Sequence, residues 1–414
     1  MLKSQLVKRR RRATGWYARA WAAIYHTELN AITVNSSTGR NRRIQLNLYK
    51  ALGLAAGIAL GAAPAGAGNI SYTCDLTVAS IDGSGVCGYL NGAGAGIYNG
   101  TFTNANANIY VTTTASGLGE SVQVTQYVTY SQYYGALSAE SNDAAALASL
   151  PSTEPTVFSS SSQYVGVTAA LVNALGIPGA STGYGAVYGV SPGAGGTDPN
   201  VSACVLGTAN CYSGVIEVVT PAGLSGETGG TQGLWYRDVA GTAGGAQPAN
   251  AYDYFTVIEH ETDELLGTSS CADVGSGPTI SNGCTAGGQI GASPSAVDLF
   301  RYSAPGTRVF DSTTAAYFSP NGGVTDTNGN AYNTTAAGED YADFLSNCKF
   351  VQDATGCPGK SVDITSDYLG GSGPEIQILN AVGYDTVITP EPGTMALCCV
   401  GLAGLGLYRR RRIS

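Results

Sequence analysis

One short segment of the chain combines a histidine with carboxylates at helical spacing. His260 and Glu264 are four residues apart, so on a helix they share one face and can bind the same cation. Glu261 lies about 100° further round such a helix, where its carboxylate could take a proton from a metal-activated water. The pattern is that of the H-E-x-x-H zinc proteases, with glutamate in place of the second histidine.

A third ligand must come from elsewhere, because the only other histidine, His26, lies in the N-terminal leader. A carboxylate can bind zinc at about 2.0 to 2.2 Å, and one histidine with two carboxylates also suits other divalent metals. We therefore expect Zn or another divalent metal as cofactor. Asp298 is the preferred third ligand, since it is the one carboxylate inside a compact apolar run, 297–302. The alternatives left open are Asp273, Asp340 and Asp343.

The same acids also have a simpler interpretation. Glu259, Glu261, Asp263 and Glu264 could be the solvated face of an ordinary helix. A serine hydrolase is disfavoured, because the sequence has no G-x-S-x-G element. In addition, residues 68–388 contain no second histidine that could act as a base.

Local patterns predict the elements that would position these residues. The segment 251–266 is expected to form the helix that carries the histidine, with Gly267 just past its end. Strands are expected at 108–114, 121–130 and 215–220, and helices at 143–150, 165–175 and 374–382. Segments 68–100 and 176–214 are predicted to be rich in loops. The result is an α+β domain over residues 68–388.

The charge of the chain is unevenly distributed. Between residues 68 and 389 there are five basic residues and 27 acidic ones, although charged residues make up only 12% of the whole chain. Such a domain repels phosphate backbones, so nucleic acid is not an expected partner. A surface rich in Gly, Ser, Thr and Asn is typical of exported proteins.

Eight of the ten cysteines fall into close sequential pairs, which predicts four short-loop disulfides in an exported chain. The alternative, a thiolate metal cluster, lacks any C-x-x-C spacing. Spacing alone does not fix the connectivity, because eight cysteines allow about 105 pairings. The pairs are Cys74 with Cys87, Cys204 with Cys211, Cys271 with Cys284, and Cys348 with Cys357.

Both ends of the chain have the composition of targeting segments. At the N-terminus, basic residues precede the apolar run 51–63, and Ala65-Gly66-Ala67 follows it, so residues 42–67 are expected to form a signal peptide. Residues 1–41 have no role in such a signal and are either a leader or an over-extended gene start. At the C-terminus, Pro390, Glu391 and Pro392 precede an apolar run, 395–408, and four arginines.

This C-terminal order resembles the PEP-CTERM sorting signal of Gram-negative bacteria. The resemblance implies that residues 389–414 are a sorting tail with a transmembrane helix, which an exosortase processes after export. The alternative is an ordinary tail anchor. The implied partners are the exosortase, the secretion machinery and, before processing, the membrane. The implied location is the cell surface or the extracellular space.

Four segments in order, 255–267, 298–306, 317–323 and 379–385, resemble a metzincin-like metalloprotease family found among PEP-CTERM proteins. The resemblance implies a zincin/metzincin-like domain with a mixed twisted sheet and an active-site helix. It also implies that His260 and Glu264 bind metal, with Glu261 as general base. The run 298–302 would form a turn below the metal, with Tyr302 as an oxyanion partner.

Two functions follow as expectations. The first is an exported metal-dependent endopeptidase that acts on a protein or peptide substrate through a metal-activated water. The alternative is a non-catalytic cell-surface or biofilm-matrix protein that keeps the metalloprotease fold. Metal content separates the two.

Overall fold

The structure is a computed structural model that describes most of the chain between residues 68 and 387. The described ranges are 68–78, 85–140, 143–153, 164–178, 182–185, 202–227, 234–236, 247–271, 293–310, 314–325, 331–332, 334, 340–345, 348–365 and 373–387. The expected signal peptide and sorting tail therefore lie outside the described residues. Contacts divide the chain into two units, 1–64 and 65–414, and all described residues belong to the second.

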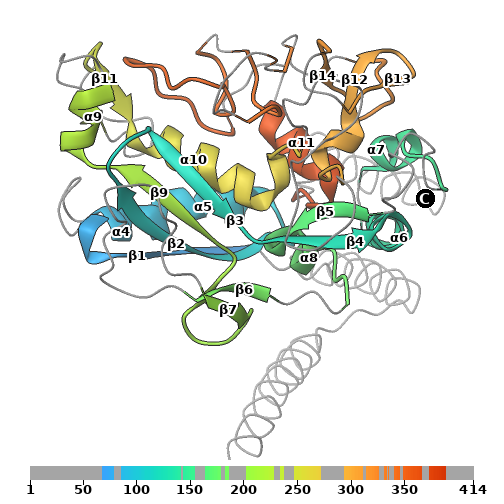
Figure 1. Ribbon diagram of the computed structural model, residues 1–414, viewed down its shortest axis with the longest axis horizontal. Helices are drawn as coiled ribbons and strands as arrows, with labels where there is room; N and C mark the ends of the chain where they lie inside the picture. The colour runs from blue at the N-terminus through green and yellow to red at the C-terminus, as the bar shows by residue number, and fades with distance from the viewer. Residues whose placement is uncertain are drawn as a thin grey trace, which may run out of the picture. The chain divides into compact units, whose positions relative to one another are not determined.

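A four-stranded mixed sheet supports the candidate site (Figure 1). Its strand order is β1-β2-β9-β3, with β1, β2 and β9 parallel and β3 antiparallel at one edge. All six residues of β9 are buried, as expected for a central strand that is covered on both faces. The strands span Asn69–Cys74 (β1), Asn106–Thr114 (β2), Gly214–Val219 (β9) and Gly119–Gln123 (β3).

Short helices connect β1 to β2, because parallel neighbours need a crossover connection. They are η1 (Leu76–Val78), α4 (Val86–Tyr89), η3 (Leu90–Gly94) and α5 (Ala95–Thr101). The prediction of a loop-rich segment at 68–100 is wrong, since small residues there allow close helix packing. Tyr98 on α5 donates hydrogen bonds to the Glu259 carbonyl (3.1 Å) and to Asp263 Oδ1 (2.7 Å).

The histidine-bearing helix, α10, spans Tyr254–Asp263 and packs against β3 and β9. It begins later than expected, because Ala251–Asp253 forms strand β11, parallel to β10 (Leu234–Tyr236). Asp253 then caps the helix by accepting from the Phe255 N–H group at 3.0 Å. A wider turn, η4 (Glu264–Thr268), ends the helix, and Gly267 there has φ of 125°.

A second group of elements packs beside the sheet. The expected strand at 121–130 is two strands, β3 and β4, and the expected helix at 165–175 is β5 followed by α8. Except for Asn173, the run at 165–175 is buried, so its pattern does not separate strand from helix. The bounds are Thr125–Thr129 (β4), Tyr130–Glu140 (α6), Ala144–Ser149 (α7), Tyr164–Thr168 (β5), Ala169–Ala174 (α8) and Pro221–Glu227 (α9).

The segment 176–214, expected to be a loop, contains three short strands: β6 (Thr182–Gly185), β7 (Ser202–Val205) and β8 (Cys211–Tyr212). The later part of the chain contains η5 (Val297–Phe300), β12 (Arg301–Ala304), β13 (Thr307–Arg308) and β14 (Tyr317–Phe318). The last described helix, α11, spans Pro374–Val382 as predicted, and Gly383 ends it with φ of 134°.

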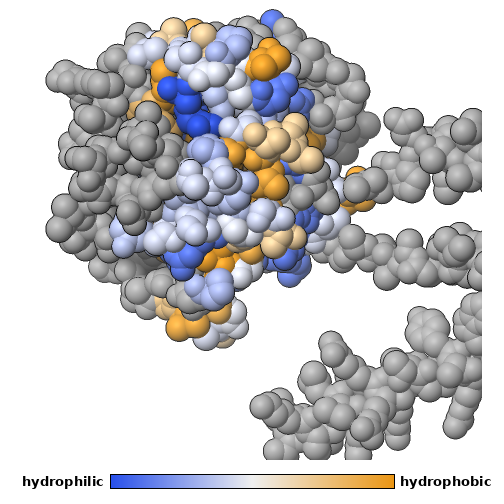
Figure 2. All heavy atoms as spheres, turned by 90° about the vertical axis from the view of Figure 1, so that its right-hand side faces the viewer, coloured by the Kyte–Doolittle hydropathy of each residue, from blue (hydrophilic) through white to orange (hydrophobic). Residues whose placement is uncertain are grey.

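Three of the predicted disulfides are confirmed: Cys74–Cys87, Cys204–Cys211 and Cys348–Cys357. Cys271 is also disulfide-bonded, while its predicted partner, Cys284, lies outside the described residues. The described residues thus form a disulfide-bonded, mixed α+β fold. On the face drawn in Figure 2, strongly hydrophilic and strongly hydrophobic residues form small separate groups, consistent with the low share of charged residues.

Candidate metal centre

Helix α10 and the turn after it bring His260 and Glu264 to the wall of a cavity of about 630 Å³. The distance between His260 Nε2 and Glu264 Oε1 is 3.7 Å. The geometry follows directly from their spacing, because residues four apart lie one above the other on a helix. The structure therefore brings together the two side chains that the sequence predicts to share one helix face.

A hydrogen bond fixes which ring nitrogen of His260 faces the cavity. The Nδ1 atom lies 2.9 Å from the Val351 carbonyl oxygen. A carbonyl oxygen only accepts hydrogen bonds, so Nδ1 carries the proton and donates it. The Nε2 atom then faces the two carboxylates. This is the usual arrangement of histidine ligands in metal sites.

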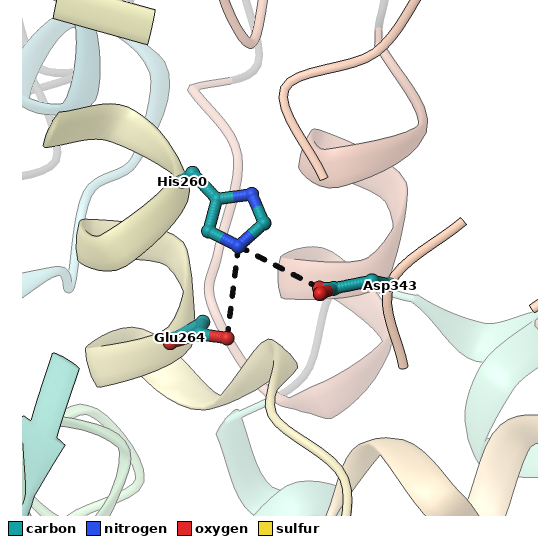
Figure 3. Close-up of side chains that lie close together, drawn as sticks. All are labelled: His260, Glu264 and Asp343. Carbon is teal, nitrogen blue, oxygen red and sulfur yellow. Dashed lines mark ion pairs between the residues drawn. The ribbon is translucent and has the colours of Figure 1, made fainter. Parts of the chain in front are cut away.

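The third member of the group is Asp343, from an irregular segment on the other side of His260 (Figure 3). Its Oδ1 atom lies 3.7 Å from His260 Nε2. One ligand atom from each of His260, Glu264 and Asp343 lies within 4.8 Å of the other two. Asp343 is one of the alternatives that the sequence left open, and the structure brings it, rather than the preferred Asp298, to this position.

The spacing of the three atoms can be compared with that of a metal site. Ligand atoms about 2.0 to 2.2 Å from a tetrahedral ion lie roughly 3.3 to 3.6 Å from one another. The two distances of 3.7 Å are slightly longer than that, and they exceed the length of a hydrogen bond. The third separation, between the two carboxylate oxygens, is no more than 4.8 Å. The donor set of one imidazole nitrogen and two carboxylate oxygens therefore suits a divalent cation if the three atoms move closer together.

Neighbouring groups orient Glu264. Ser121, on the edge strand β3, donates a hydrogen bond of 2.5 Å to Glu264 Oε2. That bond leaves Oε1 as the oxygen that faces His260. Strand β3 thus contributes both a wall of the cavity and a contact that holds a candidate ligand.

Glu261 lies on the same cavity, buried against β3. Its Oε1 atom approaches Gly119 so closely that a Cβ atom at that position would clash with it. Burial raises the pKa of the Glu261 carboxyl well above its usual value, and repulsion from the nearby Glu264 raises it further. The surroundings of Glu261 therefore favour the protonated, neutral form of its carboxyl group.

The preferred third ligand, Asp298, is not part of this group. Its carboxylate accepts hydrogen bonds from the Cys271 N–H group (2.9 Å), the Ser270 hydroxyl (2.5 Å), and both the N–H group (2.8 Å) and the hydroxyl (2.9 Å) of Ser295. Asp298 is 1% exposed and does not line the cavity. The structure thus brings Asp343, and not Asp298, into this group, and the apolar run holds a buried carboxylate that accepts backbone and hydroxyl hydrogen bonds.

Tyr302 also lies away from the candidate centre. It is buried on β12, its hydroxyl is hydrogen-bonded to Arg308, and the Arg308 guanidinium lies 5.0 Å from the centre of its ring. Neither Tyr302 nor the rest of the run 298–302 lines the cavity. Residues Val297–Phe300 do form a short turn, η5, and its position below a metal stays a prediction.

One feature of the site was not predicted from the sequence, and one of the alternatives left open for the third ligand also lies on the cavity wall. The turn at Val351 and Gln352 contacts His260, and only the flanking cysteines, Cys348 and Cys357, mark it as a constrained loop. Asp340 is a further acid on the cavity wall, and it accepts hydrogen bonds from the N–H groups of Ser270 and Ala342. Burial raises the pKa of Asp340, and Glu264 raises it further.

Comparison with known proteins identifies one segment of the chain. Residues 389–412 match the model of the PEP-CTERM protein-sorting motif. The chain carries a PEP-CTERM sorting motif. No curated protein and no solved structure gives a significant match.

The PEP-CTERM motif confirms the role expected for Pro390, Glu391 and Pro392, and it implies export followed by processing by an exosortase. The disulfides agree with an exported protein. Within the part of the chain that the structure describes, none of the helices combines the length and the apolar character that a membrane span requires. The apolar run of the PEP-CTERM tail, 395–408, lies outside that part.

Proposed function

We propose that the protein is an exported metal-dependent endopeptidase. The observation that carries the proposal is the orientation of His260. Its Nδ1–H group is bound to a carbonyl oxygen, and its Nε2 atom faces one oxygen of Glu264 and one of Asp343 at 3.7 Å. One imidazole and two carboxylates are a donor set for Zn or another divalent metal.

When bound there, a divalent cation supplies Lewis-acid chemistry, which acidifies water and polarises a peptide carbonyl group. Three side chains, His260, Glu264 and Asp343, would hold the ion. The Glu261 carboxylate would accept the proton of the attacking water and then donate it to the leaving amine. Burial of Glu261 favours the protonated form that the second step needs.

The edge strand β3 supports a peptide as the substrate. Among the described residues, β3 pairs with β9 on one side, and residues Gly119, Glu120 and Ser121 line the cavity. An extended peptide can add to such an edge through main-chain hydrogen bonds. Helix α10 packs beside a mixed sheet, and a mixed sheet with an active-site helix is what the metzincin-like resemblance implies.

Two substitutions test the proposal. Glu264→Ala removes a ligand, so the protein should lose both bound zinc and peptidase activity. Glu261→Gln keeps the ligands and removes the proton acceptor, so zinc should remain bound while kcat falls by about 100-fold or more. A wild-type protein that binds zinc but cleaves no protein substrate would favour the alternative, a non-catalytic cell-surface or biofilm-matrix protein. The scarcity of charge on the exported part favours that alternative.

A further inference from the structure

The loop closed by the disulfide Cys348–Cys357, here called the 348–357 loop, lies against the candidate metal centre. It contains none of the three candidate ligands. Its residues nevertheless line the same cavity as His260, and several of its backbone and side-chain groups are bound to the segments that supply the ligands.

The 348–357 loop holds His260 at two points. The Val351 carbonyl accepts the ring Nδ1–H group at 2.9 Å, and the Gln352 side chain donates from Nε2 to the His260 carbonyl oxygen, also at 2.9 Å. The first bond sets the tautomer of the imidazole. The second ties the loop to the helix backbone at the same residue, so the ring and its acceptor cannot separate easily.

The same loop holds the segment that carries Asp343. The Phe344 N–H group donates to the Gln352 carbonyl at 2.7 Å, and the Ala354 N–H group donates to the Phe344 carbonyl at 2.9 Å. The rings of Phe344 and Phe350 pack edge to face, with centroids 5.3 Å apart. The backbone N–H and C=O groups of Phe344 are thus both hydrogen-bonded to the loop. These bonds fix the position of the adjacent residue, Asp343.

Gln352 links these contacts to two helices. Its N–H group donates to Glu375 Oε1 on α11 at 3.1 Å, and its side-chain Oε1 accepts from the Thr268 hydroxyl at 3.3 Å. Gln352 is 1% exposed, so each of these bonds is shielded from water. One residue thus connects the end of the histidine-bearing helix, the start of α11 and the Asp343 segment.

We infer that the 348–357 loop is the positioning element of the candidate centre. It holds the imidazole ring of His260 through Nδ1 and keeps Asp343 opposite the Nε2 atom, with Gln352 as the positioning residue and the Cys348–Cys357 disulfide as the clamp. The inference rests on the proposed function of His260 and Asp343 as ligands. Groups that orient metal ligands typically change metal affinity by about 10- to 100-fold when they are removed.

The Nδ1–H group of His260 provides a test that needs no metal. In full-length His26→Gln protein His260 is the only histidine, so nitrogen-15 NMR of the metal-free protein observes this group without ambiguity. We expect the Nδ1 proton to be protected from exchange with water in this parent protein by its bond to the Val351 carbonyl, and to lose that protection when Cys348→Ser and Cys357→Ser open the loop. The matched control is Cys204→Ser with Cys211→Ser, which opens a loop of similar length away from the cavity and should leave the protection unchanged.

Zinc affinity, measured by competition with a chelator, provides the second readout. It should fall by at least about tenfold in the 348–357 loop variant and stay within about twofold of the parent in the control. Gln352→Met keeps the side-chain length without its hydrogen bonds, and it carries the test if the disulfide variant does not fold. Unchanged protection of the Nδ1 proton and an unchanged affinity in these variants would overturn the inference. A parent that binds no zinc, but whose Nδ1 proton is protected only when the loop is closed, would overturn the metal proposal alone.

Discussion

At the scale of single residues, the candidate centre depends on which aspartate faces His260. Asp343 lies 3.7 Å from the imidazole Nε2, whereas Asp298 is occupied by hydrogen bonds from Ser270, Cys271 and Ser295. Asp343 belongs to an irregular segment far along the chain, and no local pattern sets it apart from other aspartates. The pair His260 and Glu264 could be predicted because a helix alone brings them together.

We expect a change from aspartate to asparagine to have different effects at Asp343 and at Asp298. Asp343→Asn should lower zinc affinity by about tenfold or more, because a neutral amide oxygen is a weaker ligand than a carboxylate. Asp298→Asn should leave zinc affinity within about threefold and lower the free energy of unfolding by about 1 to 3 kcal/mol, because a buried acceptor is lost. Chelator competition and denaturant unfolding measure the two effects, and the reverse assignment of losses would contradict the site as described.

At the scale of elements, contacts between β3 and α10 determine where Glu261 lies. Gly119 on β3 leaves room for the Glu261 carboxylate and also approaches Val257 on the helix. The sequence predicted strand and helix in this region, but it did not predict that a glycine would face Glu261, the proposed general base. Such a contact between distant segments depends on packing, which a local pattern does not contain.

Gly119→Ala should therefore displace Glu261 while leaving the metal ligands in place. We expect kcat to fall by about 10- to 100-fold, since a shift of about 1 Å in a catalytic group can cost that much. Zinc affinity should remain close to that of the wild type. The control is Gly88→Ala on α4, where a Cβ atom meets nothing within 4 Å. Wild-type kcat in Gly119→Ala would show that this contact does not position the base.

The elements also show which predictions from the sequence succeed. Strands β2 and β9 and helices α7 and α11 were predicted nearly to their ends, because each has a clear pattern and a recognisable start or stop, such as Pro374 and Gly383. The run 165–175 was predicted as one helix because β5 and α8 are both buried and leave no periodic pattern. The crossover between β1 and β2 was missed because its glycines resemble those of loops.

At the scale of the whole molecule, acidic residues outnumber basic ones in the exported part, and several of the carboxyl groups are buried. Glu375 is 1% exposed at the first turn of α11, and burial raises its pKa from 4.5 to about 7, although backbone N–H groups partly offset the effect. Because the pKa is higher in the folded than in the unfolded state, the folded protein holds this proton between about pH 4.5 and pH 7.

The stability of the protein should therefore decrease as pH rises across that interval. The contribution of Glu375 is complete below about pH 4.5 and is lost by about pH 7, a change of about 3 kcal/mol. Unfolding in denaturant at pH 5 and pH 8 measures it, and Glu375→Gln should reduce the difference. Glu140→Gln, at an exposed position on α6, is the control and should not. Stability that rises between pH 5 and pH 8 would contradict this account of the buried acid.

The proposed peptidase activity requires that the exported protein binds a cation at His260, Glu264 and Asp343. Elemental analysis of the purified protein after dialysis against zinc tests this most directly. We predict about one equivalent of zinc per chain in the wild type and none in Asp343→Ala. A wild-type protein that retains no zinc or other divalent metal would contradict the proposed centre.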